Sequence, residues 1–337
     1  MKKTIILCVI LALICAFAMA EEAEREAYVS GDYEYALLDD GTAEITGYNG
    51  SDEELSIPSE LDGCSVTAIG DGAFYFCESL MKVTLPDSVT TIGEEAFSDC
   101  DSLTQITLPD SVINIGDWAF SGCESLTQIT IPGGVTAIGY ETFYDCDSLT
   151  QITIPDNVTT IGEGAFSNCN YLTQVTLPDS VTAIGDEAFC DCFCLTQITI
   201  PDGVTAIGDS TFHCCESLKQ INIPDSVTDI GNKAFYYCSS LTQITLPDGV
   251  TAIGDEAFYY CTSLTQITLP DSVTSIGYEA FCSCTSLKKI TIPDSVTDIG
   301  EEAFDCCFDL TAMIVGRGSY AEQYCIDNGL PYTYAGA

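Results

Sequence analysis

The chain repeats itself every 23 residues over most of its 337-residue length. Eleven glycines keep this spacing without interruption, and columns of phenylalanine, cysteine and leucine keep step with them. A unit this short cannot bury its own apolar face, so it must stack on copies of itself. The period therefore predicts one continuous solenoid. The glycines are Gly70, Gly93, Gly116, Gly139, Gly162, Gly185, Gly208, Gly231, Gly254, Gly277 and Gly300.

Each unit predicts a short strand followed by a turn. In one of them, apolar Ile106 and Leu108 alternate with polar neighbours, which is the period-two pattern of a half-buried strand. Pro109 would end that strand because it has no N–H to give to a ladder. Further on, Ala119 and Phe120, with a cysteine three residues later, would share one face of a single helical turn.

The repeat pattern L-x-x-I-x-L-P-x-x-V-x-x-I-G-x-x-A-F-x-x-C-x-S-L resembles the BspA-like class of leucine-rich repeats over residues 55–310. That class is found on secreted and surface-exposed microbial proteins. The resemblance implies an α/β solenoid of 23-residue coils, with one parallel β-sheet on one side and short helical turns on the other. It also implies binding to proteins, since some members are adhesins for host matrix proteins. That activity belongs to individual members and not to the repeat.

Residues 1–20 have the features of a signal peptide. Lys2 and Lys3 precede an apolar stretch, and Ala18-Met19-Ala20 forms a small-residue cleavage site before an acidic run. We expect cleavage after this site and no membrane span in the mature chain, because the apolar stretch is short for a bilayer. Two alternatives stay open: a retained membrane anchor, and lipidation at Cys15.

Both ends of the solenoid have the features of caps. Residues 33–38 and 43–46 flank Asp39-Asp40-Gly41, which predicts a β-hairpin over the open edge of the first coil. Ser319 and Glu322 have capping-box spacing, which predicts a closing helix over Tyr320–Asn328. The predicted organisation is a signal peptide at 1–20, an acidic segment with the hairpin cap at 21–54, the solenoid at 55–310 and a C-terminal helical cap at 311–337.

The chain is strongly acidic, with 51 acidic residues against 9 lysines and arginines and a net charge of −42. Such a charge repels nucleic-acid phosphates and anionic lipid surfaces, so neither is expected as a partner. It favours basic proteins, multivalent cations or simply solubility. A weak Ca²⁺ role for the acidic rim is left open, and no cofactor is expected.

Most of the 20 cysteines fall in one column of the repeat. Side chains in neighbouring coils run parallel, a geometry that favours a column of packed thiols over disulfide bridges. Cys190 and Cys214 lie outside the column on adjacent coils and are the best disulfide candidates. Cys190, Cys192 and Cys194 alternate, but Cys192 belongs to the buried column, so they are weak evidence for zinc and no metal site is predicted.

His213 is the one histidine of the chain. It follows Phe212, at a position predicted to face solvent on the helical turn. The cysteines beside it, Cys214 and Cys215, would be neighbours in sequence and not partners brought together by folding. Because no nucleophile–base pair or nucleotide-binding loop is present either, no catalytic residues are predicted, and the protein is expected not to be an enzyme.

The outward strand face is the first candidate binding surface. Its two polar columns contain Gln105, Gln128, Gln151, Gln174, Gln197, Gln243 and Gln266, and Thr107, Thr130, Thr153, Thr176 and Thr199. The alternative is that Gln and Thr merely suit an exposed sheet and hydrogen-bond along it. A second candidate patch is formed by Tyr236, Tyr237, Tyr259 and Tyr260. The alternative for this patch is that the rings pack between coils and bind nothing.

These observations favour an exported, non-enzymatic protein-interaction module. It would be secreted or held at the cell surface and would bind an extracellular protein or glycoprotein through the strand face, with adhesion as the specific form. The alternative is a structural scaffold of the envelope or matrix that has no dedicated ligand.

Overall fold

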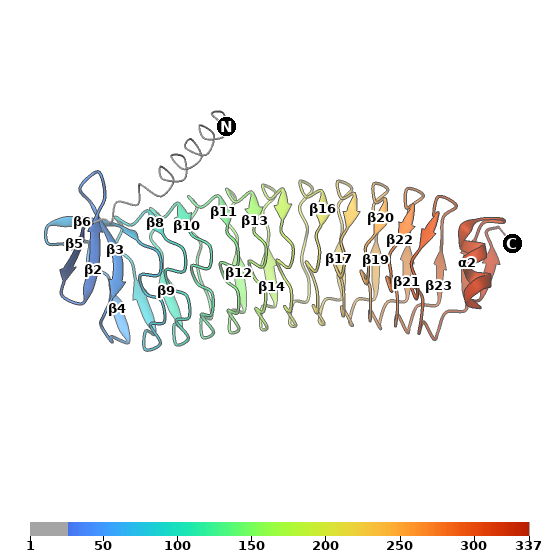
Figure 1. Ribbon diagram of the computed structural model, residues 1–337, viewed down its shortest axis with the longest axis horizontal. Coiled ribbons are helices and arrows are strands. Elements are labelled where there is room, and N and C mark those ends of the chain that lie inside the picture. The colour runs from blue at the N-terminus through green and yellow to red at the C-terminus, as the bar shows by residue number, and fades with distance from the viewer. Residues whose placement is uncertain (1–25, 337) are drawn as a thin grey trace, which may run out of the picture.

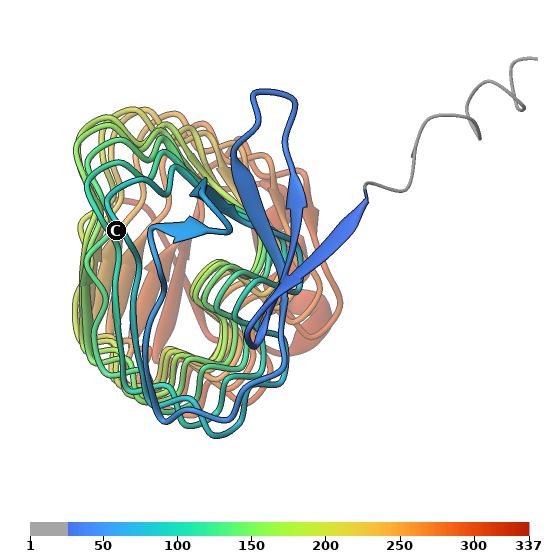
Figure 2. The ribbon, with the colours of Figure 1, turned by 90° about the vertical axis from the view of Figure 1, so that its left-hand side faces the viewer.

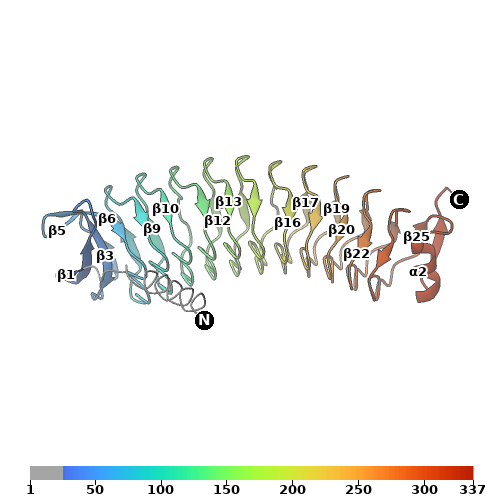
Figure 3. The ribbon, with the colours of Figure 1, turned by 45° about the horizontal axis from the view of Figure 1, so that its top comes forward.

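A computed structural model describes residues 26–336 and shows a single elongated solenoid. The coils follow one another in single file between an N-terminal hairpin and a C-terminal helix (Figure 1, Figure 3). Viewed from its N-terminal end, each coil is a closed loop around an apolar interior (Figure 2). The predicted solenoid is confirmed. Within residues 26–336, no helix combines the length and apolar character needed to cross a bilayer.

The first side of each coil is a three-residue strand of sequence Gln-Ile-Thr or a close variant, with the middle residue buried and the outer two exposed. Equivalent residues pair in parallel between coils, for example Gln151 with Gln174 and Thr153 with Thr176. The proline after each strand ends the ladder, as expected. The strands are β4 (Glu54–Ser56), β7 (Lys82–Thr84), β9 (Gln105–Thr107), β12 (Gln151–Thr153), β14 (Gln174–Thr176), β17 (Gln220–Asn222), β19 (Gln243–Thr245), β21 (Gln266–Thr268) and β23 (Lys289–Thr291).

A second parallel ladder runs beside the first, and the sequence did not predict it. It consists of two-residue strands that end at the isoleucine before each repeat glycine, where that isoleucine is buried and its partner faces outward. They are β8 (Thr91–Ile92), β10 (Asn114–Ile115), β11 (Ala137–Ile138), β13 (Thr160–Ile161), β15 (Ala183–Ile184), β16 (Ala206–Ile207), β18 (Asp229–Ile230), β20 (Ala252–Ile253), β22 (Ser275–Ile276) and β24 (Asp298–Ile299).

The third side of the coil, called the turn side below, is where helical turns were expected. It consists of hydrogen-bonded turns with two left-handed residues per coil, such as Glu95 and Asp99, at φ of +52° and +54°. Backbone N–H groups here also bond to the next coil, from Phe97 to the Ala119 carbonyl at 2.9 Å and from Asp99 to the Ser121 carbonyl at 2.8 Å. The coils are therefore held together on all three sides.

The interior contains a continuous row of phenylalanines and, beside it, a row of thiols. Phe120 and Phe143 stack with their centroids 5.5 Å apart and an interplanar angle of 7°, and the same stacking continues from Phe74 to Phe304. From Cys100 to Cys307, each thiol of the cysteine column donates to a phenylalanine carbonyl of the preceding coil, as Cys123 does to Phe97 at 3.2 Å. This bond gives the buried sulfur a polar partner.

The N-terminal cap is the predicted hairpin, preceded by one further strand. β1 (Ala27–Ser30), β2 (Tyr33–Leu37) and β3 (Ala43–Tyr48) pair antiparallel, and β3 then pairs parallel with β6 (Cys64–Ile69) of the first coil. β5 (Glu60–Leu61) pairs antiparallel with Cys64 and Ser65, at the start of β6. The hairpin thus covers the edge that the first coil would otherwise expose.

The C-terminal cap contains the predicted helix, α2 (Tyr320–Asn328). Ser319 accepts from the Glu322 backbone N–H at 3.1 Å, and Glu322 in return accepts from the Gly318 N–H, so the capping interactions are reciprocal. Gly329 ends the helix in the left-handed conformation. β25 (Ala312–Val315) pairs with β23 and with the last strand, β26 (Tyr332–Tyr334).

Candidate functional site

The strand face has the geometry that the alternation of residues predicted. All twelve Gln and Thr side chains of the candidate surface are exposed, and the Ile or Val between them is buried. Where the three-residue strand shortens to a bridge, the register is kept, as between Gln105 and Gln128 and between Gln174 and Gln197. The stacking of coils therefore aligns these residues into two continuous polar columns.

Within residues 26–336, the Gln and Thr side chains of these two columns make no hydrogen bond to the chain. The alternative in which they bond along the sheet does not match this geometry. The threonines that precede the Gln column behave differently, because they bond to the preceding coil: Thr104 donates to the Met81 carbonyl at 2.9 Å and Thr173 to the Thr150 carbonyl at 3.0 Å. The repeat pattern did not predict this third column, whose hydroxyl groups bond to the backbone of the neighbouring coil. The outer amides and hydroxyls keep their hydrogen-bonding capacity for solvent or a partner.

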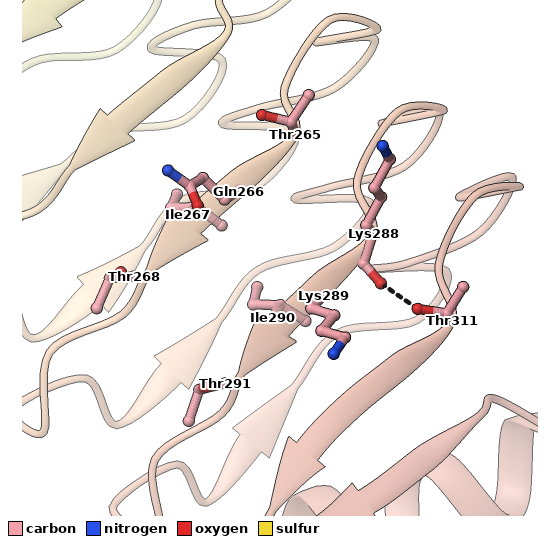
Figure 4. A pocket seen from close by; sticks show the side chains of 9 residues that line it. All are labelled: Thr265, Gln266, Ile267, Thr268, Lys288, Lys289, Ile290, Thr291 and Thr311. Atoms are coloured by element: carbon pink, nitrogen blue, oxygen red, sulfur yellow. Dashed lines mark hydrogen bonds between the residues drawn. The ribbon is translucent and has the colours of Figure 1, made fainter.

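Shallow hollows follow the strand face from coil to coil. One of about 500 Å³ lies between β21 and β23 and is lined by Gln266, Thr268, Lys288, Lys289 and Thr291, among others (Figure 4). A second, of about 400 Å³, lies over β17 and β19, and a third, of about 290 Å³, over β12. Their walls are the outward Gln, Thr, Asn and Lys side chains. The face is therefore recessed between coils and not flat.

The strand face also gathers most of the positive charge of the solenoid. Lys82 and Lys289 occupy the Gln column, and Lys219 and Lys288 stand in the column before it, all four exposed. None of them forms an ion pair with any residue between 26 and 336. Apart from Glu54 of β4, which stands beside Lys82 in the same column, the three-residue strands carry no acidic residue. From β7 to β23 the face is therefore a neutral-to-basic strip on an acidic molecule.

Several of the acidic residues that follow the repeat glycines have a structural role. The Asp71 carboxylate accepts from the Glu94 backbone N–H at 2.8 Å, and Asp255 accepts from the Tyr278 N–H at 2.7 Å. These carboxylates join one coil to the next. Over residues 26–336, no three carboxylates converge as a Ca²⁺ site would require.

The tyrosine patch packs between coils. Tyr236 stacks on Tyr259 at a centroid distance of 4.9 Å, and Tyr237 stacks on Tyr260 at 4.3 Å. Tyr260 is 38% exposed, whereas the other three are half-buried. The four rings support one another across two coils and expose mainly one member to solvent.

The cysteine column is a row of free thiols, as predicted. From Cys100 to Cys284 its members are fully buried, and burial raises the pKa of Cys100 to about 12 and that of the interior members further. Cys190 and Cys214, the best disulfide candidates, are also free thiols. Burial raises the pKa of both, to about 12 for Cys214.

The prediction for His213 was wrong in two respects. The side chain is only 25% exposed, because its ring stacks on Tyr236 at 4.8 Å with an interplanar angle of 1°. Folding also gives it partners from the preceding coil: Nδ1 lies 3.6 Å from Cys190 Sγ and 3.6 Å from Asp191 Oδ1. The approach of His213 lowers the pKa of Asp191. Because Cys190 and His213 are 23 residues apart, comparison of the repeats column by column would have shown that they occupy one position on adjacent coils, although not that their side chains meet.

Comparisons with known proteins agree with this architecture. A family model described as a BspA type leucine rich repeat region (6 copies) matches residues 67–194, 182–311 and 251–328. No curated protein matches the sequence. The pneumococcal vaccine antigen PcpA is only 17% identical, over 93% of this chain and 99% of that chain with a TM-score of 0.55, and shares the fold alone.

Two solved structures are more similar in sequence. A leucine rich cell surface protein from Faecalibacterium prausnitzii A2-165 is 32% identical; the match covers 89% of this chain and 97% of that chain, with a TM-score of 0.54. A leucine-rich repeat protein from Bacteroides ovatus is 30% identical over 91% of this chain and 99% of that chain, with a TM-score of 0.50. The chain therefore belongs to the BspA-type leucine-rich repeat family.

Proposed function

We propose that the protein is an exported, non-enzymatic interaction module whose strand face binds an extracellular protein or glycoprotein. The observation that carries the proposal is the state of the two polar columns. Their amide and hydroxyl groups are exposed, held in register and free of hydrogen bonds within residues 26–336. These groups are hydrated in the free protein, so each one that a partner pairs exchanges a hydrogen bond to water for one to the partner, with a net gain of about 0.5–1.5 kcal/mol.

The size of the face suits a folded partner. Between Gln105 and Gln266 the columns cross seven coil steps, and at about 4.8 Å a step they span roughly 34 Å, comparable to a standard protein interface. The hollows between strands offer places for protruding side chains or sugar rings. Lys288 and Lys289 make acidic or sulfated groups the preferred partners at the C-terminal end of the face, away from the neutral stretch between Gln151 and Gln197.

Export and a place at the cell surface belong to the same proposal. The features of residues 1–20 support export, although these residues lie outside the described range. The similar protein from Faecalibacterium prausnitzii carries the name of a cell surface protein, which supports the same location here. Adhesion to matrix or host proteins is the specific form that we propose.

The test is binding of the purified protein to matrix glycoproteins, mucin and polysaccharides, measured by biolayer interferometry. A variant with Gln151→Arg, Gln174→Arg and Gln197→Arg should lose at least tenfold in affinity, about 1.4 kcal/mol, because three bulky cations would fill the recessed face. The matched control carries Thr159→Arg, Thr182→Arg and Thr205→Arg. These three exposed threonines lie on the same coils, one residue before the second-ladder strands β13, β15 and β16.

Binding that both variants retain would contradict a strand-face site. If neither the protein nor the control variant binds any member of the panel, the structural scaffold is favoured. One observation supports that second candidate: the columns repeat with little variation and, over residues 26–336, carry no aromatic or arginine anchor on the three-residue strands from β7 to β23, which strong interfaces usually have.

A further inference from the structure

Two adjacent coils carry an unusual set of side chains on their turn side. Cys190 and His213 occupy one repeat position on successive coils, and Asp191 and Cys214 occupy the next. The backbone keeps the two coils aligned here, since the Asp191 N–H donates to the His213 carbonyl at 2.8 Å. In other coils the first of these positions mostly holds residues that rarely bind metals. These include Ser98, Ser121, Tyr144, Ser167, Tyr236 and Tyr259.

Three of these side chains converge on one point. Cys190 Sγ lies 3.4 Å from Asp191 Oδ2 and 3.6 Å from His213 Nδ1, and His213 Nδ1 lies 3.6 Å from Asp191 Oδ1. One donor atom from each residue falls within 4.8 Å of the other two. The fourth side chain, Cys214, follows His213 and occupies the repeat position of Asp191 on the next coil. Sulfur, nitrogen and oxygen donors therefore face one another across a coil boundary.

These separations are of the size that zinc coordination requires. Zinc bonds of about 2.3 Å to sulfur and about 2.0–2.1 Å to nitrogen or oxygen, at the tetrahedral angle, place neighbouring donors about 3.3–3.6 Å apart. Cys190 Sγ lies at this spacing from His213 Nδ1 and from Asp191 Oδ2, at 3.6 and 3.4 Å, whereas His213 Nδ1 lies 3.6 Å from the other carboxylate oxygen, Oδ1. A rotation of the Asp191 carboxylate, which needs no movement of the backbone, would bring one oxygen to both partners. The mixture of a thiol, an imidazole and a carboxylate is typical of ligands for borderline ions such as Zn²⁺.

The surroundings of the cluster support a ligand role for His213. Tyr236 stacks flat on the imidazole and fixes the plane of the ring, and Nδ1 is the nitrogen that faces Cys190 and Asp191. The Asp191 side chain is 29% exposed and that of His213 25%, which leaves a path from solvent. The net charge of −42 raises the local concentration of cations around the molecule.

We propose that Cys190, Asp191 and His213 form a binding site for one Zn²⁺-class transition-metal ion, with Cys214 or water as the fourth ligand. Binding converts the Cys190 thiol to a thiolate and releases its proton to solvent. The ion joins two coils near the middle of the solenoid. This site is distinct from the strand face, which lies on another side of the coil.

The test titrates the purified, reduced and metal-free protein with Co²⁺ under anaerobic conditions and then displaces it with Zn²⁺. We expect one equivalent per chain, visible d–d bands of a tetrahedral ion and a near-ultraviolet thiolate-to-cobalt band. His213→Tyr and Cys190→Ser should each weaken binding at least tenfold. Both substitutions install a residue that the same repeat position holds in other coils, so the fold should be retained, which circular dichroism checks.

The matched control is Cys282→Ser. Cys282 occupies the position of Cys190 four coils later, beside Asp305 and Cys306 but without a histidine, and no comparable convergence is found there. This variant should bind one equivalent with unchanged affinity. The proposal is overturned by a spectrum without the thiolate band, by binding that survives His213→Tyr and Cys190→Ser, or by mass-spectrometric detection of a Cys190–Cys214 disulfide in the isolated protein.

Discussion

Replacement of Gly185 by alanine would test whether the repeat glycine exists because two coils touch there. Gly185 follows β15, and a Cβ at this position would lie 2.7 Å from the Glu163 Cα and 2.7 Å from the Gly162 carbonyl carbon of the preceding coil. Both neighbours are backbone atoms, so no side chain can rotate away. The coils would have to separate by several tenths of an ångström or more.

The expected destabilisation follows from two contributions. Overpacking of a closed contact costs about 1–3 kcal/mol. The Gly185 N–H also donates to the Ile161 carbonyl at 2.9 Å, and the separation would weaken this bond, which is worth about 1 kcal/mol. We therefore expect Gly185→Ala to lower the free energy of unfolding by roughly 3 kcal/mol. Because each coil contacts only its neighbours, the loss is confined to one interface, and the two halves should unfold more independently.

The assay is equilibrium urea unfolding followed by circular dichroism and by the fluorescence of Trp118, the single tryptophan, which reports on the N-terminal half. In Gly185→Ala the two probes should give separate transitions. Gly133→Ala is the control, because a Cβ there meets nothing within 4 Å. It should be neutral or stabilising by about 0.4–1 kcal/mol. Equal unfolding midpoints for the two variants would refute the close-contact explanation.

Two further predictions concern backbone strain and pH. Glu95→Gly should stabilise the protein by about 1 kcal/mol in urea unfolding, because a left-handed residue with a Cβ costs about 1–2 kcal/mol. The neighbouring Glu94→Gly should destabilise the protein, since Glu94 has no positive φ and the glycine only adds freedom to the unfolded chain. Effects of equal sign would contradict the reasoning. The hydrogen bond from Tyr334 lowers the pKa of Glu322 below 4.5 in the folded state, so its stabilisation is present above pH 4.5 and is lost as the pH falls through the folded value. Thermal unfolding of Glu322→Gln should therefore show a lower midpoint than the parent at pH 7 and a shrinking difference below pH 4.5; a difference independent of pH would contradict it.

Periodicity was sufficient for the coils and for the alignment of the strand face, because the alternation around Ile106 recurs in every coil. The two caps lie outside the repeats and were predicted from local signals, the glycine turn at Gly41 and the spacing of Ser319 and Glu322. The left-handed positions were not predictable in this way. Glutamate, which rarely adopts positive φ, occupies most of one such column, and only Gly72 and Gly164 hint at the backbone geometry. There the hydrogen bonds between coils override local preference.

The convergence of Cys190 with His213 was missed for a different reason. It depends on side-chain direction and on the stacking of His213 against Tyr236, neither of which a repeat pattern specifies. The second parallel ladder was missed because its strands are only two residues long, as in β13 (Thr160–Ile161), which is too short for an alternating pattern to be read.

The hydrogen bonds between coils run in opposite directions on different sides of the solenoid. On the turn side, the N–H groups of Glu95, Phe97 and Asp99 donate to the following coil. Beside the second ladder, the N–H groups of Ile113 and Gly116 donate to the preceding coil. The peptide dipoles of the two sides therefore oppose one another along the long axis, unlike those of an α-helix, which all point one way and add. Each end of the stack consequently presents donors on one side and acceptors on another, and a cap has to satisfy both.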